Sequence, residues 1–460
     1  MSLAPTLYRE LLRTTRRLAS LTNEYNAHRV AHALNRLELR TIGASELAKT
    51  YSAKQWHQPL PPSGPHSDWY YALPSKLVRK SFRYHDDVLH EAIDDAFTAL
   101  RTGNELIDWL QVNSRLHGLR KAEADCVSGA CEISDVLHRR GSPAAPSSAS
   151  CADHVASELD GIAAAVRDLS DSGDKDSIVG RLRTIQRINA VMFDRLGFRG
   201  EYGDIEASSS LVESLARRRG LPITLSILYA GVGTRLGLPV AVTNFPSHVL
   251  LRLEASTDGG EQNTAAADAS SLAGLYTASY GSHGPEVIEV RHTNGALTAT
   301  KVTGDNHVPA GEWSWRADLP SSSILEPGAT LDAKVQIAEA GFTNPREIGG
   351  TLKVGDDSSS LVLDMEDDSL VFKRCDADAT WYIDPFARGQ LLPPDACMTI
   401  LGRAGLPPEE HAKRLEAVPP AMVWARMCRN LTIFSRREGK EAAARFWEGA
   451  ETGLDEAAAT

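Results

Sequence analysis

The arrangement of apolar residues marks residues 222–236 as a helix that is buried on most sides. Nearly every residue in this stretch is apolar or small, whereas a surface helix carries an apolar stripe on one face only. Pro222 suits the first turn of a helix, and Gly237 and Pro239 come directly after the last apolar turn. The pattern therefore predicts a core helix with defined ends.

Two short runs rich in β-branched residues and leucine follow, at residues 240–245 and 249–253. The polar and proline residues between them predict two strands, or one bent strand. His248 stands immediately before the second run, so we expect it to open that strand. A further apolar run much later in the chain ends in Asp384-Pro385-Phe386.

Amphipathic periodicity predicts helices in the amino-terminal part of the chain, at residues 7–18, 28–39 and 77–110. The last of these stretches is long enough for two helices. In the first, Leu7, Leu11 and Leu18 fall on one face, while arginines recur at helical spacing on another, at Arg9, Arg13, Arg16 and Arg17. Amphipathic helices of this kind form a small bundle.

The composition changes after this bundle. Residues 121–150 include the run GSPAAPSSAS, which is typical of a flexible linker. Helical periodicity then resumes at residues 155–169 and 178–196, and in the second of these stretches an apolar stripe is formed by Ile178, Leu182, Ile185, Ile188 and Met192.

Residues 254–284 are rich in Ala, Ser and Gly and predict a loop. Residues 287–365 consist of short runs of alternating polarity, such as VIEVR, LTATKV and GTLKV, and predict a β-module. Trp313 and Trp315 are separated by Ser314, so strict alternation would put both rings on the same face. We expect that face to be the interior of the module.

The bulk composition is that of a globular protein with several domains, with 460 residues, of which 42% are hydrophobic and 24% charged. No apolar run approaches the roughly 20 residues of a membrane-spanning helix. The net charge of −11 argues against nucleic acid as the partner of the whole molecule. Basic residues nevertheless far outnumber acidic ones before residue 86, which indicates either an acidic partner for this part or a solvated basic face.

The six cysteines show neither a CxxC pair nor a histidine at zinc-binding spacing. We therefore interpret them as reduced thiols and expect no metal site. They are Cys126, Cys131, Cys151, Cys375, Cys397 and Cys428.

The order of a buried helix, then a histidine, then an aspartate is that of a transglutaminase-like or papain-like site. The stretch from Gly197 to Arg252, beginning GFRGEYGD, resembles the transglutaminase-like domain of a bacterial family with tetratricopeptide repeats and of one branch of F-box proteins. YIDPFARGQLL and Leu431 in RMCRNL fit the same family. The resemblance implies a papain-like α+β domain with His248 and Asp384 in its site.

An active member of this class uses a cysteine at the start of the central helix, whose proton the histidine accepts. No cysteine lies between Cys151 and Cys375 here. Thr224 and Ser226 are the hydroxyls that stand in this region, and a hydroxyl is much harder to activate than a thiol. We therefore expect a pseudoenzyme without cofactor, in which His248 and Asp384 remain as a hydrogen-bonded pair, or in which Asp384 serves as a turn residue before Pro385.

LYRELLR near the amino terminus, with RKSFR further on, resembles the LYR-motif family of small mitochondrial three-helix proteins. Many members of that family bind the mitochondrial acyl carrier protein, which is acidic. The resemblance implies that arginines held on rigid helices of this chain would contact the acidic groups of the carrier. An acyl-phosphopantetheine of the carrier would then be the group that is bound. The matching positions are Leu7, Tyr8, Arg9, Arg13, Arg16, Arg17, Arg79, Phe82 and Arg83.

ALTATKVTGDNHVPAGEWSWRADL and AKVQIAEAGFTNPREIGGTLKV resemble a β-barrel domain shared by another group of F-box proteins and by the plastid EXECUTER proteins. This resemblance implies a recognition module without catalytic residues. It also implies that the transglutaminase-like domain is divided in sequence by an inserted barrel, which a surface loop can accommodate.

We therefore predict a multi-domain α+β protein. Its parts are a LYR-like helical bundle at 1–120, a linker at 121–151, a transglutaminase-like domain at 152–254 and 375–445, an inserted β-barrel-like module at 280–372, and a tail at 446–460.

The leading functional hypothesis is a non-enzymatic accessory or assembly subunit of a large mitochondrial complex, on the matrix side, that binds acyl carrier protein. The arginine-rich first residues support mitochondria, as a LYR helix or as a transit-like segment, and are compatible with a plastid or the cytoplasm. Two alternatives stay open. One is a transamidase or amide hydrolase that uses Thr224 or Ser226 with His248 and Asp384, and the other is a ubiquitin-ligase substrate adaptor.

Overall fold

The computed structural model describes most of the chain after residue 106. The described residues are 13–14, 107–108, 111–141, 151–169, 177–246, 248–254, 272–279, 285–320, 325, 328–355, 359–366, 368–375 and 380–456. They fall into two compact units, one from residues 1–147 and 419–460 and the other from residues 148–418. The predicted multi-domain α+β architecture is confirmed in this coarse form, while the amino-terminal bundle lies almost wholly outside the described residues and stays a prediction.

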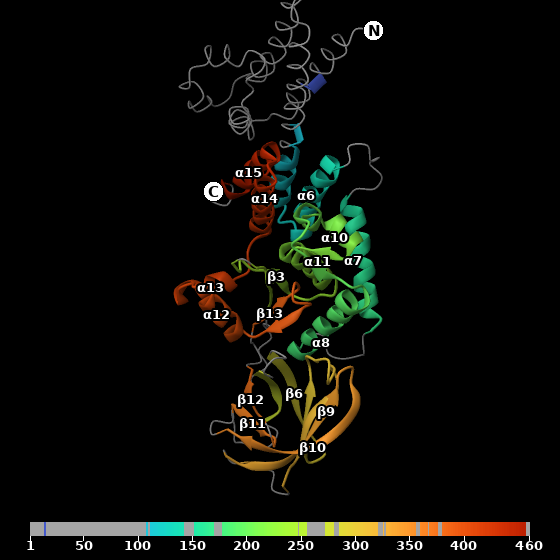
Figure 1. The fold of residues 1–460 in the computed structure, drawn as a ribbon, viewed down its shortest axis with the longest axis vertical. Helices are drawn as coiled ribbons and strands as arrows, with labels where there is room; N and C mark the ends of the chain where they lie inside the picture. Colours follow the sequence, from blue (N-terminus) through green and yellow to red (C-terminus); the bar gives the residue numbers. More distant parts are fainter. Residues whose placement is uncertain are drawn as a thin grey trace, which may run out of the picture. The chain divides into compact units, whose positions relative to one another are not determined.

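The second unit is built around α11 (Pro222–Arg235), which confirms the predicted core helix. Pro222 occupies the first turn, and all residues from Pro222 to Gly233 are buried. The helices α7, α8 and α10 lie beside it (Figure 1). The helices of this unit are α7 (Cys151–Arg167), α8 (Ile178–Asn189), α9 (Ile205–Ser209), α10 (Leu211–Arg217), α12 (Pro394–Arg403) and α13 (Pro408–Leu415).

The stretch predicted as a single helix over 178–196 has a π-helical end, η1 (Ala190–Arg195), after α8. In the π-helix the Leu196 N–H bonds to Val191 O, five residues back. Such segments widen a helix and are frequent at functional sites. The apolar stripe stays intact, since Val191, Met192 and Phe193 are buried.

A four-stranded antiparallel sheet joins residues from both sides of the β-module. Its order is β14-β13-β4-β3, with β3 (Val240–Val242), β4 (Leu251–Leu253), β13 (Trp381–Asp384) and β14 (Gln390–Leu392). β13 pairs with β4 so that Trp381 lies opposite Leu253. His248 precedes β4 by three residues instead of opening it, because the chain bends there before pairing begins. A separate parallel pair links β1 (Arg199–Gly200) to β2 (Arg219–Gly220).

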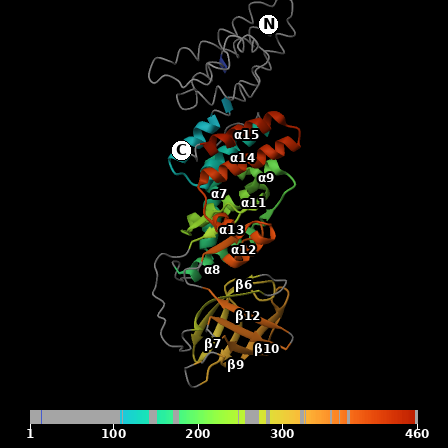
Figure 2. The same ribbon diagram turned by 90° about the vertical axis from the view of Figure 1, so that its left-hand side faces the viewer.

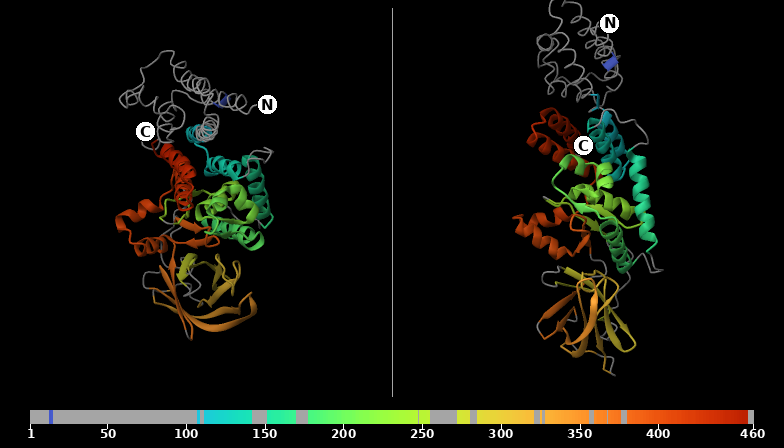
Figure 3. Two further views of the ribbon diagram at one scale, coloured as in Figure 1. Left: turned by 45° about the horizontal axis from the view of Figure 1, so that its top comes forward. Right: turned by 45° about the vertical axis from the view of Figure 1, so that its right-hand side comes forward.

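The β-module is a closed antiparallel barrel of eight strands in the order β10-β11-β12-β5-β6-β7-β8-β9, visible in Figures 1 and 3. It begins earlier than the predicted 280, because residues in the predicted loop at 254–284 form β5 and close the barrel between β12 and β6. The strands are β5 (Gly274–Ser279), β6 (Pro285–Thr293), β7 (Ala296–Lys301), β8 (Trp313–Asp318), β9 (Thr330–Glu339), β10 (Thr343–Val354), β11 (Ser360–Asp364) and β12 (Ser369–Arg374).

The prediction that Trp313 and Trp315 share the barrel interior is wrong for Trp313. The pairing of β7 with β8 shifts between Ala299 and Thr300, which face Trp315 and Trp313. This β-bulge inserts an extra residue and breaks the alternation of faces. Trp315 lies fully buried in the barrel core, while Trp313 lies beneath the guanidinium of the exposed Arg316, 4.5 Å from its ring centre.

The predicted linker at 121–151 contains a helix, α6 (Cys126–Gly141), whose buried residues include Val127, Ala130 and Ile133. It packs against α14 (Pro420–Arg437), where Trp424 donates a hydrogen bond of 3.0 Å to Cys126 O. A side chain at Gly129 would overlap the ring of Trp424. The run GSPAAPSSAS that suggested a linker begins at Gly141, the last residue of α6, and its other residues lie outside the described residues.

The described part of the predicted tail at 446–460 is also helical and belongs to α15 (Glu441–Glu456), which packs beside α14 (Figure 2). Phe446, Trp447 and Leu454 are buried there. Residues 419–460, with α14 and α15, belong to the first unit, whereas the second part of the transglutaminase-like domain is predicted to continue to residue 445. No helix in the described parts of the chain has the length and apolar character needed to span a bilayer.

Candidate functional site

His248 and Asp384 meet at one end of the four-stranded sheet. His248 Nε2 lies 2.8 Å from Asp384 Oδ1, with side chains that are 23% and 14% exposed. Asp384 is the last residue of β13, and β13 pairs with β4, which follows His248 in the chain. The pairing of these two strands therefore brings together two residues that the β-barrel separates in sequence.

Asp384 also forms the turn that follows β13. Its Oδ1 accepts hydrogen bonds of 3.0 Å from the N–H groups of Phe386 and Ala387. Its backbone carbonyl accepts from Gly389 N–H at 2.8 Å. The two interpretations of Asp384, as a histidine partner and as a turn residue, therefore hold together.

Thr224 and Ser226 lie in the first turns of α11 and are fully buried. The Ser226 hydroxyl donates to Val249 O at 3.3 Å. Thr224 Oγ1 has no hydrogen-bond partner among the described residues. Neither hydroxyl is hydrogen-bonded to the imidazole of His248, so the structure does not assemble the nucleophile and base of the enzymatic alternative.

Cys397, on α12, is a thiol near Asp384 that the sequence did not place there. It is fully buried and packs with Tyr382, Leu392 and Leu401. Burial, and secondarily the carboxylate of Asp384, raises the pKa of the Cys397 thiol to about 12. It is therefore protonated at neutral pH and a poor nucleophile. Among the residues that the structure describes, no cluster of His, Cys, Asp or Glu is suited to hold a metal ion.

Two aromatic rings that sequence reasoning missed lie next to the histidine, one in contact with it and the other packed on the first. Phe386 meets the His248 ring edge-on, with centroids 5.7 Å apart, and Tyr202 packs on Phe386 at 4.8 Å. Tyr202 is 58% exposed, an unusual position for a large aromatic side chain. Partial burial, and secondarily Asp384, raises the pKa of Tyr202.

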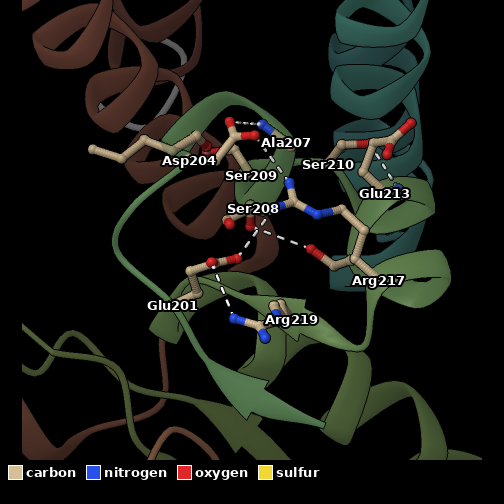
Figure 4. Close-up of polar contacts among 11 residues, drawn as sticks. Glu201, Asp204, Ala207, Ser208, Ser209, Ser210, Glu213, Arg217 and Arg219 are labelled. Atoms are coloured by element: carbon tan, nitrogen blue, oxygen red, sulfur yellow. Dashed lines mark hydrogen bonds and ion pairs between the residues drawn. The ribbon is translucent and has the colours of Figure 1, made fainter.

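Ion pairs fix the residues on either side of Tyr202, as Figure 4 shows. Arg217 contacts Glu201 at 3.4 Å and Asp204 at 3.0 Å. Arg219 contacts Glu201 at 3.3 Å. Asp204 also caps α9 by accepting from Ala207 N–H at 3.1 Å. The segment that carries Tyr202 is thus held at both ends.

Gly200, in the GFRG motif, lies directly against Phe386. A Cβ at this position would overlap the ring of Phe386. The parallel pairing of β1 with β2, in which Gly200 lies opposite Gly220, fixes this approach. The glycine of the motif therefore gives Phe386 the space to reach His248.

Asn189, the last residue of α8, connects the core helix to the turn after Asp384. Its side-chain amide donates to Gly389 O at 2.9 Å, and its Oδ1 accepts from the Tyr229 hydroxyl of α11 at 2.7 Å. Gly389 has a φ of +74°, and a side chain there would overlap Asn189. An ion pair between Arg388 and Asp194 of the π-helix holds the same turn. No pattern in the sequence indicated this network.

The predicted partner-binding residues cannot be placed around this site. Arg13 is helical and exposed. The others lie outside the described residues, namely Leu7, Tyr8, Arg9, Arg16, Arg17, Arg79, Phe82 and Arg83.

Comparisons with known proteins agree with the two recognisable parts of the chain. The family model of the transglutaminase-like superfamily matches residues 153–271, and that of the cyclin D1 binding domain matches residues 260–375. The second match covers all eight strands of the barrel. β13 lies outside both matches and pairs with β4, which lies inside the first.

Short stretches of the chain are similar to known sequences. Mouse F-box only protein 21 is 42% identical over 72 residues, which are 15% of this chain and 12% of that protein. The chloroplastic protein EXECUTER 2 of Oryza sativa subsp. japonica is 31% identical over 112 residues, 20% of this chain and 18% of the relative. A UPF0162 protein of Xylella fastidiosa is 39% identical over 69 residues, 14% of this chain and 24% of the relative.

The chain thus spans less than a quarter of the length of each of these relatives, so their similarity concerns single segments. The family model matches the segment that contains the buried α11 and His248, and the structure pairs His248 with Asp384 from the segment after the barrel. This chain therefore contains a transglutaminase-like domain, as its sequence predicted.

Proposed function

We propose that this chain is a non-enzymatic accessory or adaptor protein, in which the transglutaminase-like domain is a scaffold and the β-barrel contacts a protein partner. The observation that carries the proposal is the use of both candidate nucleophiles for packing. Ser226 is fully buried and gives its hydroxyl hydrogen to Val249 O, and Thr224 is equally buried. Substrate cannot reach either hydroxyl, so neither of them can serve the His248–Asp384 pair as a nucleophile.

The barrel offers an exposed cation and an aromatic ring on its outer face. Arg316 lies over Trp313 and has no acidic partner among the described residues. Arginine and tryptophan are enriched among the residues that dominate protein interfaces. The match to the cyclin D1 binding domain supports a protein as the partner of this module and makes cyclin D1 the first probe to use.

The enzymatic part of the proposal is tested by incorporation of a fluorescent primary amine into a glutamine-rich protein and by hydrolysis of a panel of small amides. We expect the native chain and its His248→Ala variant to give the same background signal. Turnover by the native chain that His248→Ala and Ser226→Ala both abolish would contradict the proposal and favour the transamidase or hydrolase alternative.

The binding part is tested by calorimetric titration of the full chain with purified cyclin D1. We expect saturable binding that Arg316→Glu weakens by about tenfold, the effect of losing roughly 1.4 kcal/mol at one contact. The same charge change at the exposed Arg437 of α14 is the control and should have no effect. Equal weakening by both variants would show that net charge, and not the barrel face, determines binding.

The adaptor alternative draws on the similarity to F-box only protein 21, which concerns 12% of that protein. The mitochondrial accessory role draws on the LYR-like sequence of residues 1–120. Imaging of the tagged chain in its own cells separates a mitochondrial, a plastid and a cytoplasmic location. Identification of the proteins that copurify with the tagged chain from those cells distinguishes a subunit of a large complex from a ubiquitin-ligase adaptor.

The acyl carrier protein partner is a proposal for the amino-terminal part. Several arginines at helical spacing suit a phosphate with neighbouring carboxylates, and each such contact contributes about 1.5–3 kcal/mol. Titration of the full chain with holo and acyl carrier at low and moderate salt tests it. We expect Arg9→Glu with Arg13→Glu to weaken binding at least about tenfold, and equal binding by this variant would refute the LYR interpretation.

A further inference from the structure

A small cluster of charged side chains lies inside one end of the β-barrel. Glu286, at the start of β6, and Lys301, at the end of β7, are each 3% exposed at the side chain. Glu286 precedes Ile288 and Lys301 follows Ala299 by two positions, and both of these neighbours belong to the barrel core. By the alternation of faces along a strand, Glu286 and Lys301 therefore point inward, at the end of the apolar interior.

A third charge reaches the cluster from the loop between β7 and β8. Lys301 Nζ lies 2.7 Å from Glu286 Oε1 and 2.7 Å from Asp305 Oδ2. Asp305 Oδ1 in turn accepts hydrogen bonds from the N–H groups of His307 and Val308, at 2.6 and 2.7 Å. The lysine thus joins the wall of the barrel to the residue that organises the loop.

The loop at residues 302–312 is closed on itself and attached on two sides. Lys301 N–H donates to Glu312 O, and Gly311 N–H donates to Lys301 O, each at 2.8 Å. A side chain at Gly304 would overlap the backbone of Ala310. On the far side, Asn306 O accepts from Gly341 N–H at 2.7 Å, in the turn between β9 and β10. The loop therefore bridges the charged cluster and a second strand pair.

The cluster has two carboxyl groups and only one ammonium group. With every group ionised it would hold a buried net charge of −1, which is strongly unfavourable away from water. One proton bound to the carboxyl pair makes the cluster neutral. Opening of the loop would return Asp305 to solvent and leave Glu286 with Lys301 alone, so that this proton is released.

We propose that Glu286, Lys301 and Asp305 form a proton-dependent latch that holds the 302–312 loop across the end of the barrel and weakens as pH rises. Burial, and next hydrogen bonding to Asp305, raises the pKa of Glu286 to about 8. Burial alone would raise the pKa of Asp305, but hydrogen bonds from Glu286, Lys301 and Val308 N–H lower it well below its usual range. The carboxyl of Glu286 is therefore the one that keeps the proton.

The other elements around Glu286 bring few competing charges. On β5 the residue opposite Glu286 is Ala278, which cannot titrate. On β6 the next inward residue is Ile288, and on β7 the only charge at the cluster is Lys301. Within the described residues of the loop, His307 lies nearest, with Nδ1 3.9 Å from Asp305 Oδ1 and a side chain 41% exposed. Because it is the nearest other ionisable group, one of the control variants replaces it.

Hydrogen exchange of the backbone N–H groups of His307 and Val308 tests the latch in the full chain. Because one proton is released on opening, their protection, corrected for the intrinsic rate, should fall by up to about tenfold per pH unit between roughly pH 6 and 8 and level off above. Glu286→Gln should keep the loop protected and remove the pH dependence. Asp305→Asn should also remove it, because the remaining Glu286 and Lys301 form a neutral pair.

Two variants serve as controls in the same measurement. Glu312→Gln changes a carboxylate at the end of the loop, outside the cluster, and should follow the native curve. His307→Gln should do so as well. Native protection that is constant between pH 6 and 8, or a Glu286→Gln curve that matches the native one, would overturn the proposal. If protection in His307→Gln does not change with pH, the imidazole of His307 and not the carboxyl pair causes the pH dependence, and the proposal is overturned as well.

Discussion

Asp384 Oδ1 is hydrogen-bonded both to His248 and to the turn after β13. It lies 2.8 Å from His248 Nε2 and accepts two backbone hydrogen bonds of the turn, from Phe386 and Ala387. A carboxylate that is held by three donors resists rearrangement more than one held by the histidine alone. The turn thus holds Asp384 beside His248 through the fold of the domain, whether or not the domain catalyses a reaction.

Substitutions at the two members of this pair should have unequal effects on stability. His248→Ala removes one partner and should cost about 1 kcal/mol of unfolding free energy, whereas Asp384→Ala leaves two N–H groups unpaired and should cost about 2–4 kcal/mol. Asp384→Asn keeps an acceptor oxygen for the turn and should fall between them. Urea unfolding of the full chain followed by circular dichroism measures all three, and equal losses for His248→Ala and Asp384→Ala would contradict the role of the turn.

Gly200→Ala should displace Phe386, because the added methyl group overlaps its ring. Overpacking of this kind costs about 1–3 kcal/mol. In a Phe386→Ala background the same change should cost much less, since the ring that obstructs it is gone. A double-mutant cycle of unfolding free energies gives the coupling directly, and a coupling near zero would mean that Gly200 is required for another reason.

Gly389→Ala should destabilise the chain more than Gly405→Ala. Both glycines have positive φ, +74° and +80°, so both substitutions introduce backbone strain. At Gly405 the added Cβ meets open space, whereas at Gly389 it overlaps Asn189. We expect about 1 kcal/mol for Gly405→Ala and at least about 2 kcal/mol for Gly389→Ala, in unfolding measured by urea. Similar losses would show that Asn189 moves freely.

The stability of the barrel should depend on pH through Glu286. The pKa of its carboxyl is about 8 in the folded chain and close to 4.5 when unfolded, so the folded state holds the extra proton between these values. The stabilisation is complete below pH 4.5 and declines as pH rises to 8, by at most about 1.4 kcal/mol per unit. Glu286→Gln should remove this decline in thermal unfolding between pH 5 and 8, and parallel curves for both proteins would contradict it.

The core helix was predictable because every signal in its sequence agrees. Pro222 begins it, Gly237 follows it, and its residues are apolar on all sides, as a helix enclosed by α7, α8 and α10 requires. The meeting of His248 with Asp384 was predictable only through the family resemblance. Strand pairing between distant segments leaves no local pattern, so the periodicity of β13 alone does not identify β4 as its neighbour.

The errors have local physical causes. The helix α6 was assigned to a linker because the glycine, proline and serine residues that follow it dominated the window, although Val127, Ala130 and Ile133 are spaced for one helical face. Trp313 was placed inside the barrel because alternation was assumed to be unbroken, and a bulge depends on the register of the neighbouring strand. The Asn189 network joins three segments through side chains, which periodicity does not report.

The closing of the barrel has a consequence for the order in which the chain folds. Arg374 pairs with Tyr276, and Cys375 N–H bonds to Leu275 O, so the entry and exit of the barrel lie side by side. If the barrel folds first, it shortens the effective distance between β4 and β13 and lowers the entropy cost of joining them. If it is slow, Leu253 and Trp381 must find each other across a long unstructured segment. A folded barrel thus brings the strands that carry His248 and Asp384 closer together before these two residues meet.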